Sequence, residues 1–122
     1  MEAKYFIQEY RELTGDERSL LEWLLANGYE GASTFTSQLA QAKVVSRCAC
    51  GCPTIDLAVG DKQERTTGPS TILADVAGYS PEGVKVDVIL YARAGQLSEL
   101  EIVSHDDTTA FTLPRPEALQ PY

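Results

Sequence analysis

Three cysteines within five residues are the part of this sequence best suited to chemistry. Cys48, Cys50 and Cys52 lie in the segment Cys-Ala-Cys-Gly-Cys-Pro, and the chain has no other cysteine. Thiolates are common ligands of structural zinc, and His105, the single histidine, could complete a Cys3His tetrahedron. Structural zinc sites more often use Cys-x2-Cys spacing, which turns both sulfurs toward one ion more readily than Cys-x-Cys does. Zinc is therefore the one cofactor that the sequence suggests, as an alternative rather than as the first interpretation.

The cysteine segment allows two further interpretations. A nucleophilic or redox-active cysteine needs a lowered thiol pKa, which a nearby base or a helix N-terminus provides, and a turn between strands offers neither. A structural corner needs small side chains at a crowded bend, and buried cysteines beside Gly51 and Pro53 satisfy that need. We therefore expect reduced, non-catalytic cysteines and no bound cofactor, with zinc or a reactive thiol as the alternatives.

The acidic residues form the second group of candidates. The net charge of −8 opposes binding to nucleic acid and to anionic membranes, because both need Lys and Arg, whereas it attracts a basic protein. Alternation along the expected strands places five candidate contact residues on the sheet face opposite the helices: Asp56, Asp87, Tyr91, Glu99 and Glu101. Tyr91 would supply contact area and the carboxylates would steer a basic partner. The alternative is a solvated face whose charges only maintain solubility.

These features favour a non-enzymatic, protein-binding function. Because the sequence contains no catalytic motif, the first hypothesis is an acidic inhibitor or immunity-type protein that neutralises a basic partner such as a nuclease toxin. The second hypothesis is a small zinc-binding or thiol-based enzyme or sensor that uses the cysteine segment. Metal analysis of the purified protein separates the two hypotheses.

Two N-terminal helices are expected before the cysteine segment. Thr14 and Glu17 form a capping box at the start of the first helix. The apolar stripe that follows consists of Leu20, Leu21, Leu24 and Leu25, with Trp23 at its edge. Gly28 can end this helix in the left-handed conformation. A second helix is expected over residues 32–42, with Phe35, Leu39 and Ala42 on one face.

From residue 43 onward the hydrophobic pattern changes to a period of two. The expected strands are 44–48, 54–59, 72–77, 84–91, 97–104 and a short edge strand at 109–113. Residues 60–70 form a long polar loop, a candidate for a binding or lid loop. Residues 1–13 are expected to pack across the domain as an extended arm. The predicted fold is α+β, with two N-terminal helices packed on one face of a mostly antiparallel five- or six-stranded sheet.

Length and composition set the remaining expectations. With 122 residues, 43% of them hydrophobic, the chain is expected to form a single domain over residues 1–122. No apolar run approaches the ~18 residues needed to cross a bilayer. The N-terminus has no basic-then-apolar signal region, so we expect a cytoplasmic location.

Three segments together resemble a set of small uncharacterised bacterial proteins. They are Leu13-Thr14-Gly15-Asp16-Glu17-Arg18 with Leu20-Leu21, the segment Cys48-x-Cys-Gly-Cys-Pro-x-Ile, and Ser80-Pro81-Glu82-Gly83. The cysteine segment is the most specific of the three. The resemblance implies a bacterial source and a single-domain fold, and it implies no mechanism.

Overall fold

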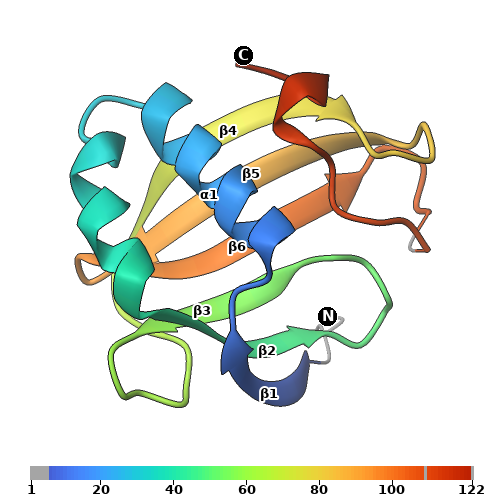
Figure 1. The fold of residues 1–122 in the computed structure, drawn as a ribbon. Coiled ribbons are helices and arrows are strands. Elements are labelled where there is room, and N and C mark those ends of the chain that lie inside the picture. Colours follow the sequence, from blue (N-terminus) through green and yellow to red (C-terminus); the bar gives the residue numbers. More distant parts are fainter. Residues whose placement is uncertain (1–5, 109, 122) are drawn as a thin grey trace.

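Antiparallel strands form one sheet, and the longer helices lie on one of its faces (Figure 1). The computed structural model describes residues 6–108 and 110–121, in which the sheet has seven strands in the order β1-β2-β3-β6-β5-β4-β7. The strands are β1 Phe6–Glu12, β2 Ala42–Cys48, β3 Ile55–Val59, β4 Ser70–Tyr79, β5 Lys85–Arg93, β6 Gln96–Ser104 and β7 Leu119–Pro121. The helices are α1 Gly15–Asn27 and the 3-10 helices η1 Ala32–Gln41 and η2 Pro116–Ala118. The predicted α+β class is confirmed, with seven strands rather than five or six. No helix in these residues is long and apolar enough to cross a membrane.

Both edge strands of the sheet were missing from the expected pattern. The N-terminal arm does not pack across the domain, since its described part is strand β1, which pairs with β2. At the opposite edge, β7 pairs with β4. Gly78 permits this pairing, because a Cβ at that position would collide with the carbonyl oxygen of Ala118. Both edge strands are therefore defined by their partners rather than by a hydrophobic period of their own.

The prediction of an edge strand at 109–113 is wrong for its described part. Residues 110–113 have no regular secondary structure, and Thr109 lies outside the described residues. Thr112 donates its backbone N–H and its hydroxyl to the Glu82 carboxylate, at 3.1 and 2.6 Å. Because this carboxylate takes a backbone donor that a strand would use, the segment is held against the β4–β5 turn instead of pairing with the sheet.

Helix α1 begins and packs as its sequence predicts. The Glu17 N–H donates to Thr14 Oγ1 at 3.1 Å, and the Thr14 N–H donates to Glu17 Oε1 at 2.9 Å, which is the expected capping box. The four leucines of the predicted stripe are at most 1% exposed. They form one core with buried sheet residues, among them Leu57, Val88 and Leu100. Trp23 packs at the edge of this core, as expected.

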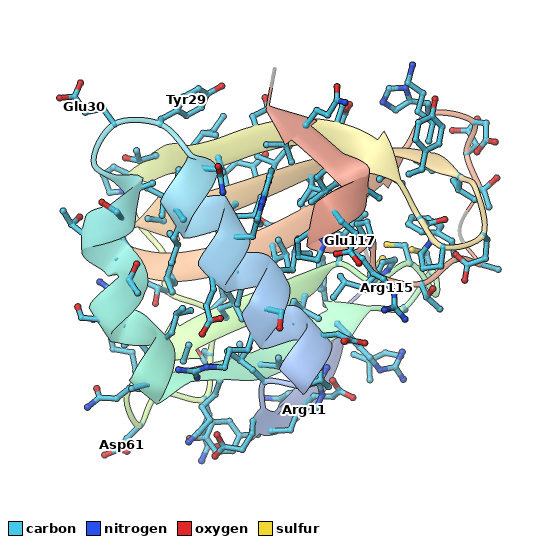
Figure 2. All side chains as sticks on the ribbon, turned by 45° about the horizontal axis from the view of Figure 1, so that its top comes forward. Arg11, Tyr29, Glu30, Asp61, Arg115 and Glu117 are labelled. Carbon is cyan, nitrogen blue, oxygen red and sulfur yellow. The ribbon has the colours of Figure 1, made fainter. Side chains whose placement is uncertain are left out.

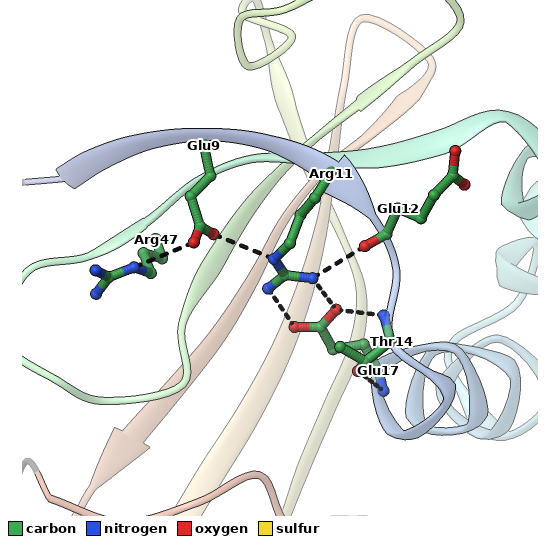
Figure 3. A network of polar contacts seen from close by, with 6 residues as sticks. All are labelled: Glu9, Arg11, Glu12, Thr14, Glu17 and Arg47. Atoms are coloured by element: carbon green, nitrogen blue, oxygen red, sulfur yellow. Dashed lines mark hydrogen bonds and ion pairs between the residues drawn. The ribbon is translucent and has the colours of Figure 1, made fainter.

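An ion-pair network fastens the start of α1 to strands β1 and β2 (Figure 3). The Arg11 guanidinium donates two hydrogen bonds to the Glu17 carboxylate, at 2.9 and 3.0 Å. Glu9 bridges the two strands, since its carboxylate lies 3.2 Å from Arg11 Nε and 3.3 Å from Arg47 Nε. Burial opposes the ionisation of Glu17, but the hydrogen bonds from Arg11 and Thr14 hold its pKa below the usual value. The acidic first turn of α1 is thus fixed in position next to the cysteine-bearing strand β2.

The end of α1 differs from the prediction. Gly28 does not adopt the left-handed conformation, because its backbone is extended, with φ −85° and ψ −164°. Glycine is needed there for another reason: a Cβ would collide with the carbonyl oxygens of Leu24 and Leu73. The adjacent N–H of Tyr29 donates to the Leu73 carbonyl at 2.8 Å. The helix therefore ends directly against β4.

The second helical segment is a 3-10 helix that covers the same face of the sheet as α1 (Figure 1). The predicted apolar face does turn toward the core, with Leu39 and Ala42 buried and Phe35 partly buried. Gln38 connects the segment to the β5–β6 hairpin: its Oε1 accepts the N–H of Leu97 and its Nε2 donates to the Gly95 carbonyl, both at 2.9 Å. One polar side chain therefore fixes η1 over the end of the hairpin.

Candidate thiol site

The three cysteines occupy the connection between β2 and β3. Cys48 is the last residue of β2, and β3 begins at Ile55. The Cys48 N–H donates to the Thr54 carbonyl at 3.1 Å, which closes the base of the connection. The Thr54 hydroxyl accepts the N–H of Ile102 at 2.9 Å and so anchors the connection to β6. Residues 49–53 extend beyond this base, at one end of the sheet (Figure 1).

The sulfur atoms of the three cysteines converge on one point. All three Sγ atoms lie within 4.8 Å of one another, and those of Cys48 and Cys50 are 2.7 Å apart. Figure 2 shows the sulfur atoms together at this end of the sheet. The N–H of Cys50 lies 3.4 Å from Cys48 Sγ, and the N–H of Cys52 lies 3.4 Å from Cys50 Sγ. The Cys-x-Cys-x-Cys spacing succeeds here because Gly51 has a left-handed backbone, with φ 98°, and turns the chain between the sulfurs.

The three thiols differ in burial. Cys48 is only 5% exposed, Cys52 is half-buried and Cys50 is exposed. The expected buried corner is therefore found at Cys48 alone. Core packing does not explain the cysteine at position 50, because the side chain of Cys50 faces solvent.

The pKa values of the Cys48 and Cys50 thiols are shifted in opposite directions. Burial, reinforced by the neighbouring Cys50 sulfur, raises the pKa of Cys48 to about 12. Burial also opposes the ionisation of Cys50, but the Cys48 thiol and the N–H of Cys52 stabilise its thiolate and hold its pKa below the usual value. The sequence offered neither a base nor a helix N-terminus for such a shift. A second thiol and a backbone amide supply it instead.

His105 does not join the three sulfurs, so the predicted Cys3His tetrahedron is wrong. The His105 N–H donates to the Lys85 carbonyl at 3.0 Å, and its side-chain Nε2 lies 3.1 Å from Asp87 Oδ2. The pairing of β5 with β6 therefore directs the imidazole to a carboxylate on the neighbouring strand. Among the described residues, the group of His, Cys, Asp and Glu side chains close enough to share one metal ion consists of the three cysteines.

A shallow depression adjoins the cysteine segment on the side of α1. It has a volume of about 270 Å³ and lies between Cys52, the first turn of α1 and residues 112–113. Arg11 and Arg47 line it, and both belong to the ion-pair network of Figure 3. A small molecule can therefore reach the cysteine segment from this side.

Two of the five predicted partner-contact residues are buried. Asp56 and Glu99 lie opposite each other on β3 and β6 and are 5% and 6% exposed. Arg65 Nη1 lies 3.7 Å from a carboxylate oxygen of each residue, and Arg93 Nη2 lies 3.2 Å from Glu99. Burial, followed by the charge of Asp56, raises the pKa of Glu99. The structure therefore pairs these two acids with arginines instead of presenting them to a partner.

The other three predicted contact residues are half-buried, and each has a polar partner. Tyr91 donates its hydroxyl to Glu101 Oε1 at 2.9 Å. Burial, together with this hydrogen bond, raises the pKa of Tyr91 to about 12. Asp87 is the carboxylate that pairs with His105. These three side chains lie next to one another on β5 and β6, opposite the helices.

The residues that sequence reasoning missed are the basic partners of the buried acids. A register shift in the β5–β6 pairing inserts Ser98, so that both Ser98 and Glu99 bond to Arg93, at 2.9 and 3.2 Å. The predicted lid loop, residues 60–70, brings Arg65 to the same place. Strand alternation cannot reveal a bulge or the path of a loop. The available signal was the occurrence of arginines in the loop and at the end of β5.

Comparison of this chain with known protein families, with curated proteins and with solved structures returned no match in any of the three.

Proposed function

We propose that the protein binds a thiophilic metal ion, with zinc as the principal candidate, through Cys48, Cys50 and Cys52. The observation that carries the proposal is the convergence of three Sγ atoms within 4.8 Å of one another. In a tetrahedral site with Zn–S bonds of about 2.3 Å, the sulfurs are about 3.8 Å apart. The cluster lies within reach of this value, and the Cys48–Cys50 pair, at 2.7 Å, must open to attain it.

The exposure of Cys50 defines the kind of metal site. A purely structural zinc ion has four protein ligands, whereas three protein ligands leave one position for water or another molecule. Here that position faces solvent, since Cys50 is exposed and no fourth His, Cys, Asp or Glu joins the cluster in the described part of the chain. The site is therefore suited to exchange or sensing of a soft metal ion rather than to permanent structural binding.

A zinc titration of the reduced, metal-free protein against a chromophoric chelator tests the proposal. We expect one zinc ion per chain, and we expect Cys52→Ser to lower the affinity at least about 100-fold because a direct ligand is lost. His105→Ala is the matched control, because the structure pairs His105 with Asp87, and it should bind as the wild type does. Binding that survives in the triple Cys→Ser variant would refute the site.

The affinity of the protein for zinc should rise with pH. A metal-bound cysteine is a thiolate, and the pKa of Cys48 is raised to about 12, so this thiol is protonated in the free protein at neutral pH. Binding therefore releases a proton, and the apparent affinity should increase about tenfold per pH unit for each proton released. Titrations at several pH values, corrected for zinc hydrolysis, measure this slope. A pH-independent affinity would mean that no protonated thiol is a ligand.

A second candidate function, binding of a basic protein, is supported by the sheet face opposite the helices. Apolar side chains are exposed beside carboxylates on this face: Ile72 is 43%, Tyr79 52% and Val103 39% exposed. Val103 lies opposite Asp87 in the β5–β6 ladder. A face that combines exposed apolar area with acidic groups suits a partner with a basic and apolar surface, which includes a toxin neutralised by an inhibitor.

Charge reversal tests this second candidate. Asp87→Lys with Glu101→Lys should abolish the salt-dependent capture of basic proteins on the immobilised protein. The matched control is Glu30→Lys with Asp61→Lys, which makes the same change of charge at sites away from this face (Figure 2). Equal loss in both variants would indicate that only the net charge of the protein matters.

A further inference from the structure

The cysteine cluster contains a pair of thiols with the arrangement that thiol–disulfide exchange needs. Cys50 is exposed at the turn, and Cys48 is buried directly behind it with its sulfur 2.7 Å away. This separation is shorter than the ~3.5 Å of ordinary non-bonded contact and longer than the ~2.05 Å of a disulfide bond. Only a small movement therefore separates the two sulfurs from bonding distance.

The hydrogen bonds of the two thiols match their accessibility. The exposed sulfur of Cys50 accepts hydrogen bonds from the Cys48 thiol and from the Cys52 N–H, at 2.7 and 3.4 Å. Hydrogen-bond donors at these positions favour a thiolate, which is the attacking species in exchange. The buried Cys48 cannot meet a substrate first, and a disulfide on Cys50 would make it the nearest nucleophile.

We propose that the Cys48–Cys50 pair exchanges with low-molecular-weight disulfides, with Cys50 as the attacking thiol and Cys48 as the resolving thiol. The depression of about 270 Å³ beside Cys52 offers room for one half of a small disulfide. Cys52 is not consumed in this reaction. Its backbone N–H supports the attacking sulfur, and its own thiol remains reduced.

The exchange consists of two balanced steps. The Cys50 thiolate attacks one sulfur of the substrate disulfide, forming a mixed disulfide and releasing the other half as a thiolate that takes a proton from water. Cys48 then loses its proton to solvent and attacks Cys50 Sγ, forming the Cys48–Cys50 disulfide and releasing the second half as a thiol. The substrate disulfide is the oxidant: it becomes two thiols, and the protein dithiol becomes a disulfide.

A consequence that rests on the proposed metal function is redox control of the site. The oxidised pair leaves Cys52 as the only thiol of the cluster, and one thiol does not hold zinc. Oxidation should therefore release the metal, and reduction should restore binding. The same three cysteines would then respond both to metal availability and to the thiol–disulfide balance of their surroundings.

The test uses the reduced, metal-free protein and oxidised glutathione, followed by acid quenching, mass spectrometry and peptide mapping. In the wild type, we expect the Cys48–Cys50 disulfide as the final product, with a glutathione adduct only as a transient. Cys48→Ser should accumulate the adduct on Cys50, and Cys50→Ser should react at least about tenfold more slowly. Circular dichroism checks the fold of the buried Cys48 variant, and peptide mapping of the wild-type product identifies the disulfide without any substitution.

Two results would overturn the exchange: a glutathione adduct that persists on the wild type, or a Cys50→Ser variant that reacts as fast as the wild type. Because these reactions contain no metal, their outcome is independent of the zinc titration. Exchange without zinc binding would remove the metal function and leave the exchange standing, and zinc binding without exchange would do the reverse. A final measurement, zinc release from the loaded protein on addition of oxidised glutathione, tests the connection between the two.

Discussion

Two connections between antiparallel neighbours, at opposite ends of the sheet, are built in different ways (Figure 1). Ala94 and Gly95 alone join β5 to β6, and both are left-handed, with φ 51° and 79°, as a type I′ hairpin turn requires. Residues 49–54 join β2 to β3 and contain two of the three cysteines. A turn of two residues is enough to reverse the chain between antiparallel strands. The pairing of β2 with β3 therefore does not explain the length of the connection between them.

The difference separates a connection that stabilises the fold from one that holds the thiols of the proposed site. The β5–β6 hairpin is held by side-chain hydrogen bonds from Gln38. The β2–β3 connection is closed at its base by the backbone of Thr54 and anchored to β6 by the Thr54 hydroxyl, and its turn contains further contacts made by sulfur atoms. Changes in the hairpin should therefore affect stability, and changes in the cysteine segment should affect chemistry.

The largest effect is expected in the core that both connections share. Leu24 is completely buried between α1 and the sheet, so Leu24→Ala should lower the free energy of unfolding by about 2–5 kcal/mol. Denaturant unfolding measures this loss. The zinc affinity of the folded fraction should not change, because Leu24 is not a metal ligand and Cys52 packs only against the edge of the helix–sheet core. A parallel fall in zinc affinity would show that the two regions are coupled.

Zinc should stabilise the wild type and leave a cysteine variant unaffected. At a free zinc concentration 100 times the dissociation constant, binding to the folded state adds about 2.7 kcal/mol to stability. Cys50→Ser with Cys52→Ser should lose this increment. The stability of this variant without metal should stay within about 1 kcal/mol of the wild type, because Cys50 is exposed and Cys52 is half-buried at the edge of the core. Thermal melts with and without zinc test both parts.

The hairpin should respond to the loss of its polar connection to η1. Gln38→Ala removes the acceptor of the Leu97 N–H and should cost about 1–3 kcal/mol of unfolding free energy, with zinc affinity unchanged. Gln63→Ala, an exposed glutamine in the loop after β3, is the matched control and should have no measurable effect. If both variants melt alike, Gln38 does not support the hairpin.

The smallest effect is expected at Ala94. An L-residue other than Asn or Asp loses about 1–2 kcal/mol in the left-handed conformation, and Asn is preferred in type I′ turns. Ala94→Asn should therefore raise the unfolding free energy by about 1 kcal/mol, and Ala94→Val, which is β-branched, should lower it. Denaturant unfolding of the two variants distinguishes them. Destabilisation by Asn would mean that the turn is not of this type.

The local features of the chain were predictable where adjacent residues supply both partners. The capping box at Thr14 and Glu17 needs residues three positions apart, and the leucine stripe of α1 needs only the helical period. The strands from Val44 to Ser104 followed the period of two, apart from their exact ends. Strand β7 has no such signal, because its three residues are too short to show a period and only pairing with β4 makes them a strand.

The site was less predictable because its properties depend on contacts between distant or irregular segments. His105 directly follows the expected strand 97–104, yet the β5–β6 register directs it to Asp87 and away from the sulfurs. Alternation placed Asp56 and Glu99 on the outward face, but it could not show that a bulge and a loop would bury them beside arginines. Register and loop path are decided by the whole sheet, and no local pattern encodes them.

The sequence by itself determined the α+β class, the start and buried face of α1, and the presence of three cysteines at a turn after a strand, because each follows from the type and spacing of neighbouring residues. Only the tertiary structure decided which cysteine is buried, which is exposed, and how their sulfurs affect one another. The reason is physical: burial and the proton affinity of a thiol depend on the atoms that surround it in space, and these come from β2, the turn and β3 together.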